Sequence, residues 1–300
     1  MLFKSKKARK SGEDQRLEAV LILIMLIVGV IMAYPLLIVV STSFSSAAAV
    51  TSGRVWLLPV EFSLEGYKAV FRTNDVLIGY RNSLFYMVAG TIVNIFMTLL
   101  AAYPLSRDDL VGQGFFMKLF TFTMIFGGGM IPNYLLLKDL GMLNTVWAMI
   151  IPGAISTYNM IITRTFIKTN IPKEMLEAAK IDGCSDIQYL IKMVIPLSGS
   201  VIAVITLYYA IEHWNAYFSA FMYLTKKNLY PLQIFLKNIL ISNQVQSDLL
   251  TDDAQVLATQ GIAEVLKYSL IVVAVIPVMI MYPFIQKHFV KGVMIGAVKG

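Results

Sequence analysis

Long stretches without a charged side chain are the feature that most constrains this sequence. Each stretch is long enough for a helix of about 20 residues, the length that crosses the hydrocarbon core of a bilayer. Backbone groups in hydrocarbon must be satisfied within the segment, which favours helices, whereas barrel strands would alternate over about 10 residues. The sequence therefore predicts an all-α membrane protein with six transmembrane helices. The six runs lie at 19–53, 82–106, 119–137, 140–163, 193–225, where Glu212 is the single interruption, and 268–286.

The composition also indicates a membrane protein. Charged residues make up 14% of the 300 positions, whereas soluble domains carry about 25%. Cys184 is the only cysteine, which excludes an intrachain disulfide framework. The first apolar run is longer than a signal peptide and has no small-residue cleavage site, so we expect it to remain as an anchor. We expect an N-terminal segment at 1–18, one six-helix membrane domain at 19–288 and a tail at 289–300.

The distribution of Lys and Arg predicts the orientation of these helices. With the N-terminus in the cytoplasm, 16 of the 25 basic residues fall on the cytoplasmic side, as the positive-inside rule requires. Both termini are therefore expected to be cytoplasmic. The net charge of +7 is then a topology signal, and nucleic acid is not an expected partner because the basic residues form no stripe with aromatic residues. Trp56 and Trp147 stand near predicted helix ends, where interfacial anchors are enriched.

Several kinds of catalytic chemistry are missing from the sequence. It has no Gly-Lys dipeptide, so it has no phosphate-binding loop of the G-x-x-x-x-G-K-[ST] type. His213 and His288 are the only histidines and form no H-E-x-x-H motif. No G-x-S-x-G motif is present either. We expect no catalytic residue, cofactor site or metal site in this chain.

The region 170–196 reads as two short helices joined by a turn. Residues 174–180 have high helix propensity, and Gly183 can adopt the left-handed conformation that ends a helix. Ser185 and Gln188 match a capping box that would start the second helix. From the residues alone, this pair fits either a helix that docks into a partner or an interfacial connector between two spans.

The spacing in this region resembles the coupling-loop signature of ABC importer permeases. Glu177-Ala178-Ala179, three residues, Gly183, nine residues and then Met193-Val194-Ile195-Pro196 match E-A-A-x3-G-x9-I-x-L-P, with Met193 and Ile195 replacing Ile and Leu. In that family this loop is the coupling helix that docks into a cytosolic ATPase. The resemblance therefore implies that a coupling role falls on Glu177, Ala178, Ala179, Asp182 and Gly183.

Other segments resemble the permeases of carbohydrate-uptake ABC importers. They lie at 56–59, 62–67, 81–84, 101–107, 214–215, 289–292 and 296–300. Residues 127–132 and 212–215 resemble the subgroup that imports oligosaccharides derived from polysaccharides, such as the second permeases of alginate importers. The resemblance implies a bacterial cytoplasmic-membrane protein that works with a homologous second permease, two ATPase subunits holding ATP and Mg²⁺, and an extracytoplasmic solute-binding protein. It also implies that the outside loop 223–266 meets the binding protein and that the tail 287–300 contacts the ATPase.

Polar residues at helical spacing suggest a pathway for the cargo. Four of them, at 208, 212, 215 and 219, would share one face of a single helix. Hydroxyl, amide and aromatic groups are the groups that bind carbohydrates. The alternative is that these residues join helices to one another. The candidate pathway residues are Tyr86, Asn94, Asn159, Tyr208, Glu212, Trp214, Asn215 and Ser219.

The sequence leaves two other functions open. Glu212 is a carboxylate within a span, which is costly unless it faces water or a partner, so it could be the coupling group of an ion-driven carrier. The chain could also be an ABC permease for a solute other than a sugar. A possible acidic cargo, such as alginate or pectin fragments, would be repelled by Glu212 unless that carboxylate is paired or protonated.

Overall fold

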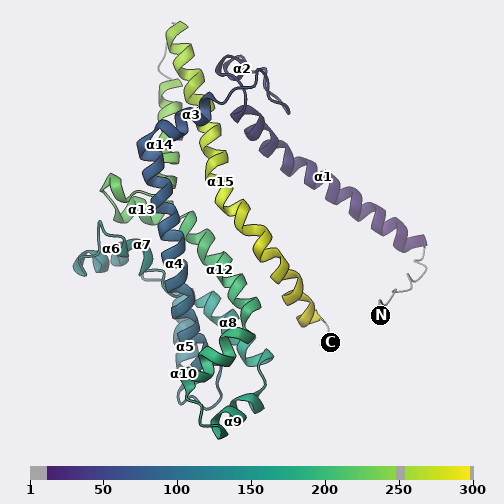
Figure 1. Cartoon of the computed structure of the whole chain (residues 1–300), viewed down its shortest axis with the longest axis vertical. Coiled ribbons are helices and arrows are strands. Elements are labelled where there is room, and N and C mark those ends of the chain that lie inside the picture. Colours follow the sequence, from purple (N-terminus) through teal and green to yellow (C-terminus); the bar gives the residue numbers. More distant parts are fainter. Residues whose placement is uncertain (1–11, 248–253, 298–300) are drawn as a thin grey trace. The chain divides into compact units, whose positions relative to one another are not determined.

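The computed structural model describes residues 12–247 and 254–297, and these are helical or connect helices (Figure 1). The basic residues before position 12, the centre of the 223–266 loop at 248–253, and the last three residues of the predicted tail lie outside the described residues. The α-helices are α1 (Gly12–Ser43), α2 (Ala47–Thr51), α3 (Glu65–Arg72), α4 (Asn74–Ser106), α5 (Gln113–Ile125), α6 (Met130–Asp139), α7 (Trp147–Ile150), α8 (Thr157–Asn170), α9 (Lys173–Ile181), α10 (Asp186–Tyr189), α11 (Ile195–Leu197), α12 (Gly199–Trp214), α13 (Tyr217–Tyr223), α14 (Leu232–Ser247) and α15 (Ala254–Ala297). A π-helical turn (Leu190–Val194) joins α10 to α11, and a 3-10 turn (Lys227–Leu229) precedes α14.

The predicted all-helical membrane fold is confirmed, but the count of six spans is not. Among the described residues, three helical segments are long and apolar enough to cross a membrane: Arg16–Ser43, Asn74–Ser106 and Gly261–Pro283. Two bent pairs, α5 with α6 and the α10–α11 segment with α12, raise the number to five if each pair is one span. The remaining predicted run, 140–163, is not one helix, because the chain turns between α7 and α8.

Glycine and proline account for two of these breaks. Gly129 has a φ of +86°, a conformation that other residues rarely adopt, and it stands where α5 and α6 meet at 112°. Between α7 and α8 the sequence runs through Pro152 and Gly153 before Ser156 caps α8, its hydroxyl accepting from the backbone N–H of Asn159. Proline lacks the N–H that a continuing helix needs. The break at 151–156 therefore has a local cause.

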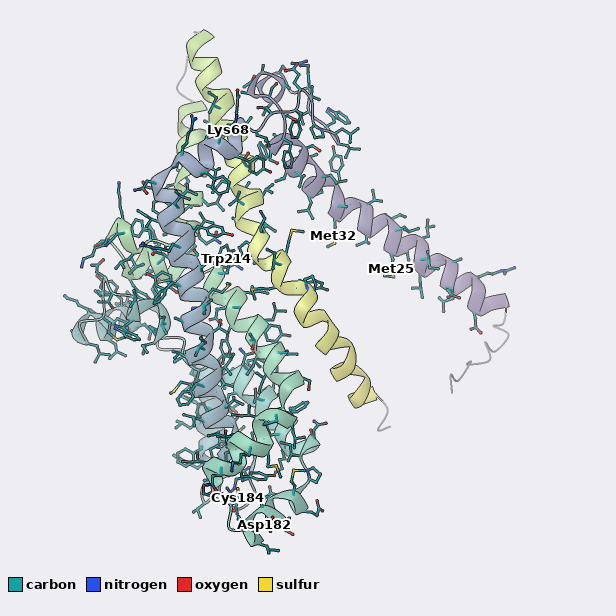
Figure 2. The ribbon with its side chains drawn as sticks, viewed as in Figure 1. Met25, Met32, Lys68, Asp182, Cys184 and Trp214 are labelled. Carbon is teal, nitrogen blue, oxygen red and sulfur yellow. The ribbon has the colours of Figure 1, made fainter. Side chains whose placement is uncertain are left out.

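The chain divides into two compact units. The first contains α1, α2, α3 as far as Val70, and residues 242–273. Its α1 is exposed along its apolar length, and Figure 2 shows Met25 and Met32 projecting from it. The segment after α1 is fixed to its last turn, because the Ser41 hydroxyl donates to the Leu57 carbonyl at 2.7 Å and the Val60 N–H donates to the Ser45 hydroxyl at 3.0 Å. This segment carries Trp56, whose side chain is 69% exposed.

The depth of Trp56 follows from this attachment. About 20 residues of α1 can cross the hydrocarbon, so counting from Ala19 puts the end of the crossing near Ile38. Ser41, which holds Leu57, lies three residues farther along the helix. Trp56 is therefore expected at the level of the lipid headgroups, where tryptophan is enriched.

The second unit is built around α4. Its buried face packs against α8 and α12, and a chain of hydrogen bonds links the three helices. The hydroxyls of Thr98 and Tyr209 lie 2.7 Å apart, and the Ser156 N–H donates to the Tyr209 hydroxyl at 3.1 Å. At the N-terminal end of α4, Gly79 allows α14 to approach, since a Cβ there would lie 2.6 Å from the Phe235 ring. The second unit therefore has a packed interior that runs along most of α4.

Candidate coupling site and transport pathway

The predicted pair of helices at 170–196 is confirmed. The first helix, α9, follows Pro172 and ends at Gly183, whose φ is +72°. The Gly183 N–H donates to the Lys180 carbonyl at 3.1 Å and the Cys184 N–H to the Ala179 carbonyl at 2.9 Å, which is the paired bonding of a Schellman ending. These local bonds fix where the helix stops.

The second helix begins as the sequence predicts. The Ser185 hydroxyl accepts from the Gln188 N–H at 3.3 Å, and the Ser185 N–H donates to the Gln188 side chain at 3.1 Å. This reciprocal capping box starts α10, and the chain stays helical through Pro196 with one π-helical turn. Asp182 and Cys184 stand in the turn between the two helices (Figure 2).

The surface of α9 has one buried and one exposed side. Ala179 is buried against the unit's own core, beside Tyr189 and Val194. Its small side chain therefore packs within this chain, and Ala179 does not lie on the exposed side of α9. Ala178, Glu177, Asp182 and Gly183 are exposed. Ile181, which the sequence motif does not single out, is 87% exposed and adds an apolar group to the same surface.

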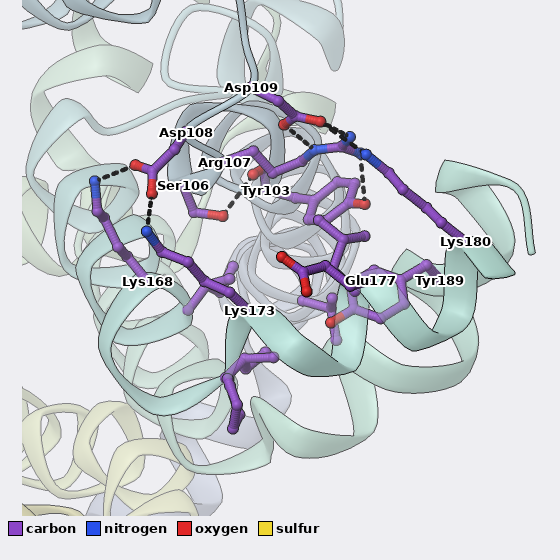
Figure 3. Close-up of a pocket in the computed structure, with 15 residues that line it drawn as sticks. Tyr103, Ser106, Arg107, Asp108, Asp109, Lys168, Lys173, Glu177, Lys180 and Tyr189 are labelled. Carbon is purple, nitrogen blue, oxygen red and sulfur yellow. Dashed lines mark hydrogen bonds and ion pairs between the residues drawn. The ribbon is translucent and has the colours of Figure 1, made fainter.

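Ion pairs hold α9 against the end of α4 (Figure 3). Asp108 pairs with Lys168 at 2.7 Å and with Lys173, the first residue of α9. Asp109 pairs with Lys180, in the last turn of α9, at 3.0 Å, and with Arg107 at 2.5 Å. These groups surround a cavity of about 240 Å³ that Glu177 also lines.

These pairs shift the pKa values of Asp108, Asp109 and Arg107 in the directions that favour their charged forms. Hydrogen bonds from Lys168 and Lys173 lower the pKa of Asp108 to about 2. Hydrogen bonds from Arg107 and Lys180 hold the pKa of Asp109 well below its ordinary value. The Asp109 carboxylate in turn raises the pKa of Arg107. Asp108, Asp109 and Arg107 are therefore charged near neutral pH.

The predicted pathway residues on 208–219 do not share one helix. The helix α12 ends at Trp214, Asn215 is its C-cap, and Ser219 lies on the separate helix α13. The expectation of one continuous polar face is therefore wrong for Ser219, which is half-buried. Tyr208, Glu212 and Asn215 are exposed on or at the end of α12.

The other predicted pathway residues are buried, and three of them make hydrogen bonds within the second unit. The Tyr86 hydroxyl donates to the Leu229 carbonyl at 2.9 Å, and the Trp214 ring N–H donates to the Ala274 carbonyl at 3.0 Å. The Asn94 amide donates to the Gly153 carbonyl, and Asn159 is 3% exposed. In this conformation Tyr86, Asn94, Asn159 and Trp214 are buried in the interior of the second unit.

His213 is a further member of the buried network. Its Nε2 lies 2.6 Å from Oδ1 of Asn94. Gly90 makes room for the ring, since a Cβ at that position would lie 2.3 Å from Nε2. His213 belongs to the 212–215 segment that resembles oligosaccharide permeases, but nothing in its local sequence indicates a partner 119 residues away.

Comparison with known proteins identifies the family. Residues 76–295 match the family described as the binding-protein-dependent transport system inner membrane component. The chain belongs to this permease family. A Bacillus subtilis relative, the polygalacturonan/rhamnogalacturonan transport system permease protein YtcP, is 42% identical over 277 residues, covering 92% of this chain and 96% of the relative. Protein LplC of the same organism is 40% identical and covers 91% of each chain.

A solved structure shows the same fold. The crystal structure of a bacterial ABC transporter that imports the acidic polysaccharide alginate contains a chain with a TM-score of 0.85 and 35% identity, covering 94% of this chain and all of that chain. The resemblance to carbohydrate ABC importer permeases is thereby confirmed. The protein is a membrane permease of a binding-protein-dependent system, a transport subunit that does not itself catalyse a reaction.

Proposed function

We propose that this chain carries oligosaccharides rich in uronic acids through the membrane in an ATP-driven importer. The alginate and polygalacturonan named for its relatives are both acidic polysaccharides, which supports this class of cargo. In this proposal a homologous second permease completes the pathway, two cytosolic ATPase subunits hold ATP and Mg²⁺, and an extracytoplasmic binding protein delivers the cargo. The broken region from α7 to α8 forms the sixth crossing, and both termini are cytoplasmic.

The observation that carries the coupling role is the exposed side of α9. Glu177 and Asp182 offer negative charge, Ile181 offers an apolar side chain, and Ala178 between them is small enough for close approach. The turn at Gly183 is rigidly bonded, so the helix is presented in one orientation. A short amphipathic helix of this kind fits a groove in a partner. We propose that the ATPase docks on this side of α9.

The cargo pathway in this proposal includes fewer residues than the sequence predicts. Tyr208, Glu212 and Asn215 combine an aromatic ring, a carboxylate and an amide on one exposed region of α12. The ring suits the apolar face of a sugar, and the polar groups suit its hydroxyls. Because a bare carboxylate repels a uronate, Glu212 acts in this proposal together with a cation from the second permease or bound to the cargo.

Family membership decides between this function and the carrier alternative. A binding-protein-dependent permease draws on ATP hydrolysis by its partners, so Glu212 has no need to couple transport to an ion gradient. The names of the curated relatives favour a carbohydrate over another solute. In this proposal Glu212 contacts the cargo.

Stimulated ATP hydrolysis tests the proposal. The chain is co-expressed with its partner subunits and reconstituted in lipid, and the binding protein is added bare or loaded with galacturonate, alginate or neutral oligosaccharides. We expect hydrolysis to rise with binding protein loaded by one of the acidic classes. Stimulation by neutral oligosaccharides alone would refute the cargo assignment, and uptake that follows an ion gradient without ATP would refute the importer mechanism.

A further inference from the structure

Two consecutive aspartates after α4 contact the two ends of α9. Asp108 pairs with Lys173 at the first position of α9, and Asp109 pairs with Lys180 in its last turn. The paired residues are more than 60 positions apart in the sequence. The ion pairs therefore connect α9 directly to the end of α4, whereas the backbone connects them only through a long intervening segment. Arg107 extends this contact to Asp186, the first residue of α10.

The base of this segment is held firmly. The Arg107 side chain is 14% exposed, donates to the Tyr103 hydroxyl at 3.1 Å and binds Asp109 through two of its nitrogens. The Leu105 carbonyl accepts from the side chains of Gln113 at 2.7 Å and Arg164 at 2.8 Å. Isolated exposed ion pairs contribute little, but these pairs share their carboxylates and rest on a half-buried arginine. The segment 107–109 therefore behaves as part of α4.

Attachment at two points limits how α9 can move. The nine residues of α9 span about 13 Å, and the two aspartates hold it near each end. A helix held at one end could pivot, whereas a helix held at both ends moves with the body that holds it. A displacement of α9 is therefore passed to the end of α4.

The helix α4 can carry that displacement a long way. It is a single helix of 33 residues, about 50 Å long, with its one proline, Pro104, in the last turn. Near its other end, the Asn82 amide donates to the carbonyls of Asn228 and Tyr230 at 2.8 and 3.0 Å. The Ser83 hydroxyl accepts from the Leu232 N–H at 2.9 Å. The same helix thus joins the surroundings of α9 to the segment 228–232.

We propose that Arg107, Asp108 and Asp109 form a strut that transmits movement of α9 through α4 to the segment 228–232. The three are positioning residues, because they act through α9 and touch neither nucleotide nor cargo. The inference rests on the proposed docking of an ATPase on α9. It adds a direct path to the far side of the membrane that does not run through α8 or α12.

The test separates transmission from docking. Asp108→Asn and Asp109→Asn are combined in the intact transporter, and uptake per ATP hydrolysed is measured with loaded binding protein. We expect this ratio to fall about fivefold, the lower end of usual coupling between sites, while the ATPase subunits still co-purify. Asp108→Glu with Asp109→Glu keeps both charges and should restore most of the ratio. Glu61→Gln is the matched control, because it removes a carboxylate from another exposed ion pair, with Arg54.

A second readout follows α9 itself. Cys184, the only cysteine of the chain, stands just beyond α9 and can carry a nitroxide label when the partner subunits are cysteine-free. We expect the label to become more mobile in the double asparagine variant than in wild type or Glu61→Gln. An unchanged transport ratio together with unchanged mobility would overturn the strut. Failure of the docking proposal looks different, because Glu177→Lys would then leave uptake intact.

Discussion

Replacing Gly90 by alanine should destabilise the protein through His213. A Cβ at position 90 would lie 2.3 to 2.6 Å from three atoms of the His213 ring, where ordinary contacts are 3.4 Å or more. The ring must therefore move by about 1 Å, which breaks its 2.6 Å contact with Asn94. Overpacking costs about 1–3 kcal/mol, and a buried polar group without its partner costs about 1–3 kcal/mol. Because the two terms overlap, we expect a loss of about 2–4 kcal/mol in the free energy of unfolding.

Thermal unfolding in detergent measures this loss. The expected fall in Tm is roughly 5–10 °C. Gly29→Ala is the matched control, because it makes the same change inside a helix where nothing lies within 4 Å, and alanine favours helices by about 1 kcal/mol. The Gly90→Ala cost should shrink when His213→Ala is already present, since the obstructing ring is gone. A Tm for Gly90→Ala equal to that of wild type would refute the packing argument.

Four further outcomes are expected. Glu177→Lys or Gly183→Pro should abolish uptake while the protein stays in the membrane, because the first changes the docking surface and the second removes the Schellman turn, whose Gly183 N–H bonds to Lys180; membrane-localised protein with normal uptake would contradict this. Glu212→Ala should alter the ranking of sugars in a competition assay, and an unchanged ranking would make it a packing residue. The pKa of Asp108 is lowered to about 2, so its ion pairs are fully present above its unfolded pKa near 4 and are lost only as the pH falls toward 2. Uptake per ATP should therefore not depend on the titration of Asp108 between about pH 5 and 8. A pH profile that differs in shape between wild type and Asp108→Asn in that range would contradict this expectation. Trp56→Phe removes the tryptophan fluorescence of position 56, and this fluorescence should be quenched most strongly by lipids brominated near the headgroup. Quenching only by lipids brominated deep in the acyl chain would contradict the expected depth of Trp56.

The turn chemistry of the coupling region could be predicted from the sequence because it is local. The N–H groups of Gly183 and Cys184 end α9 by donating to carbonyls three and five positions back, and Ser185 and Gln188 cap α10 through each other. Such motifs depend on few neighbours, so residue type and spacing determine them. The same holds for the apolar runs, whose length alone indicates membrane helices.

The polar face on 208–219 could not be predicted correctly because its helix is ended by tertiary contacts. The side chain of Gln233 donates to the Trp214 carbonyl at 3.1 Å, at the point where α12 stops. No glycine or proline stands at that position in the sequence, so the spacing of polar residues predicts a helix that continues to Ser219. A distant residue helps to decide where the helix ends.

The contacts of 107–109 were also beyond the sequence. Asp108 and Lys168 are 60 residues apart, and Asp109 and Lys180 are 71 apart. The pattern of charges in each segment fits an ordinary cytoplasmic loop that follows the positive-inside rule. Only the packing of α4 against α8 brings the two loops together.

Cross-linking from the exposed side of α9 tests the central claim most directly. Ile181→Cys is introduced together with Cys184→Ser, and Lys226→Cys, in the loop before α14, serves as the comparison. In the assembled transporter we expect a short thiol cross-linker to join position 181 to an ATPase subunit and to leave position 226 unlinked to it. A complex that imports its cargo with no cross-link from position 181, or with the ATPase linked to position 226 instead, would contradict the assignment of α9 as the coupling helix.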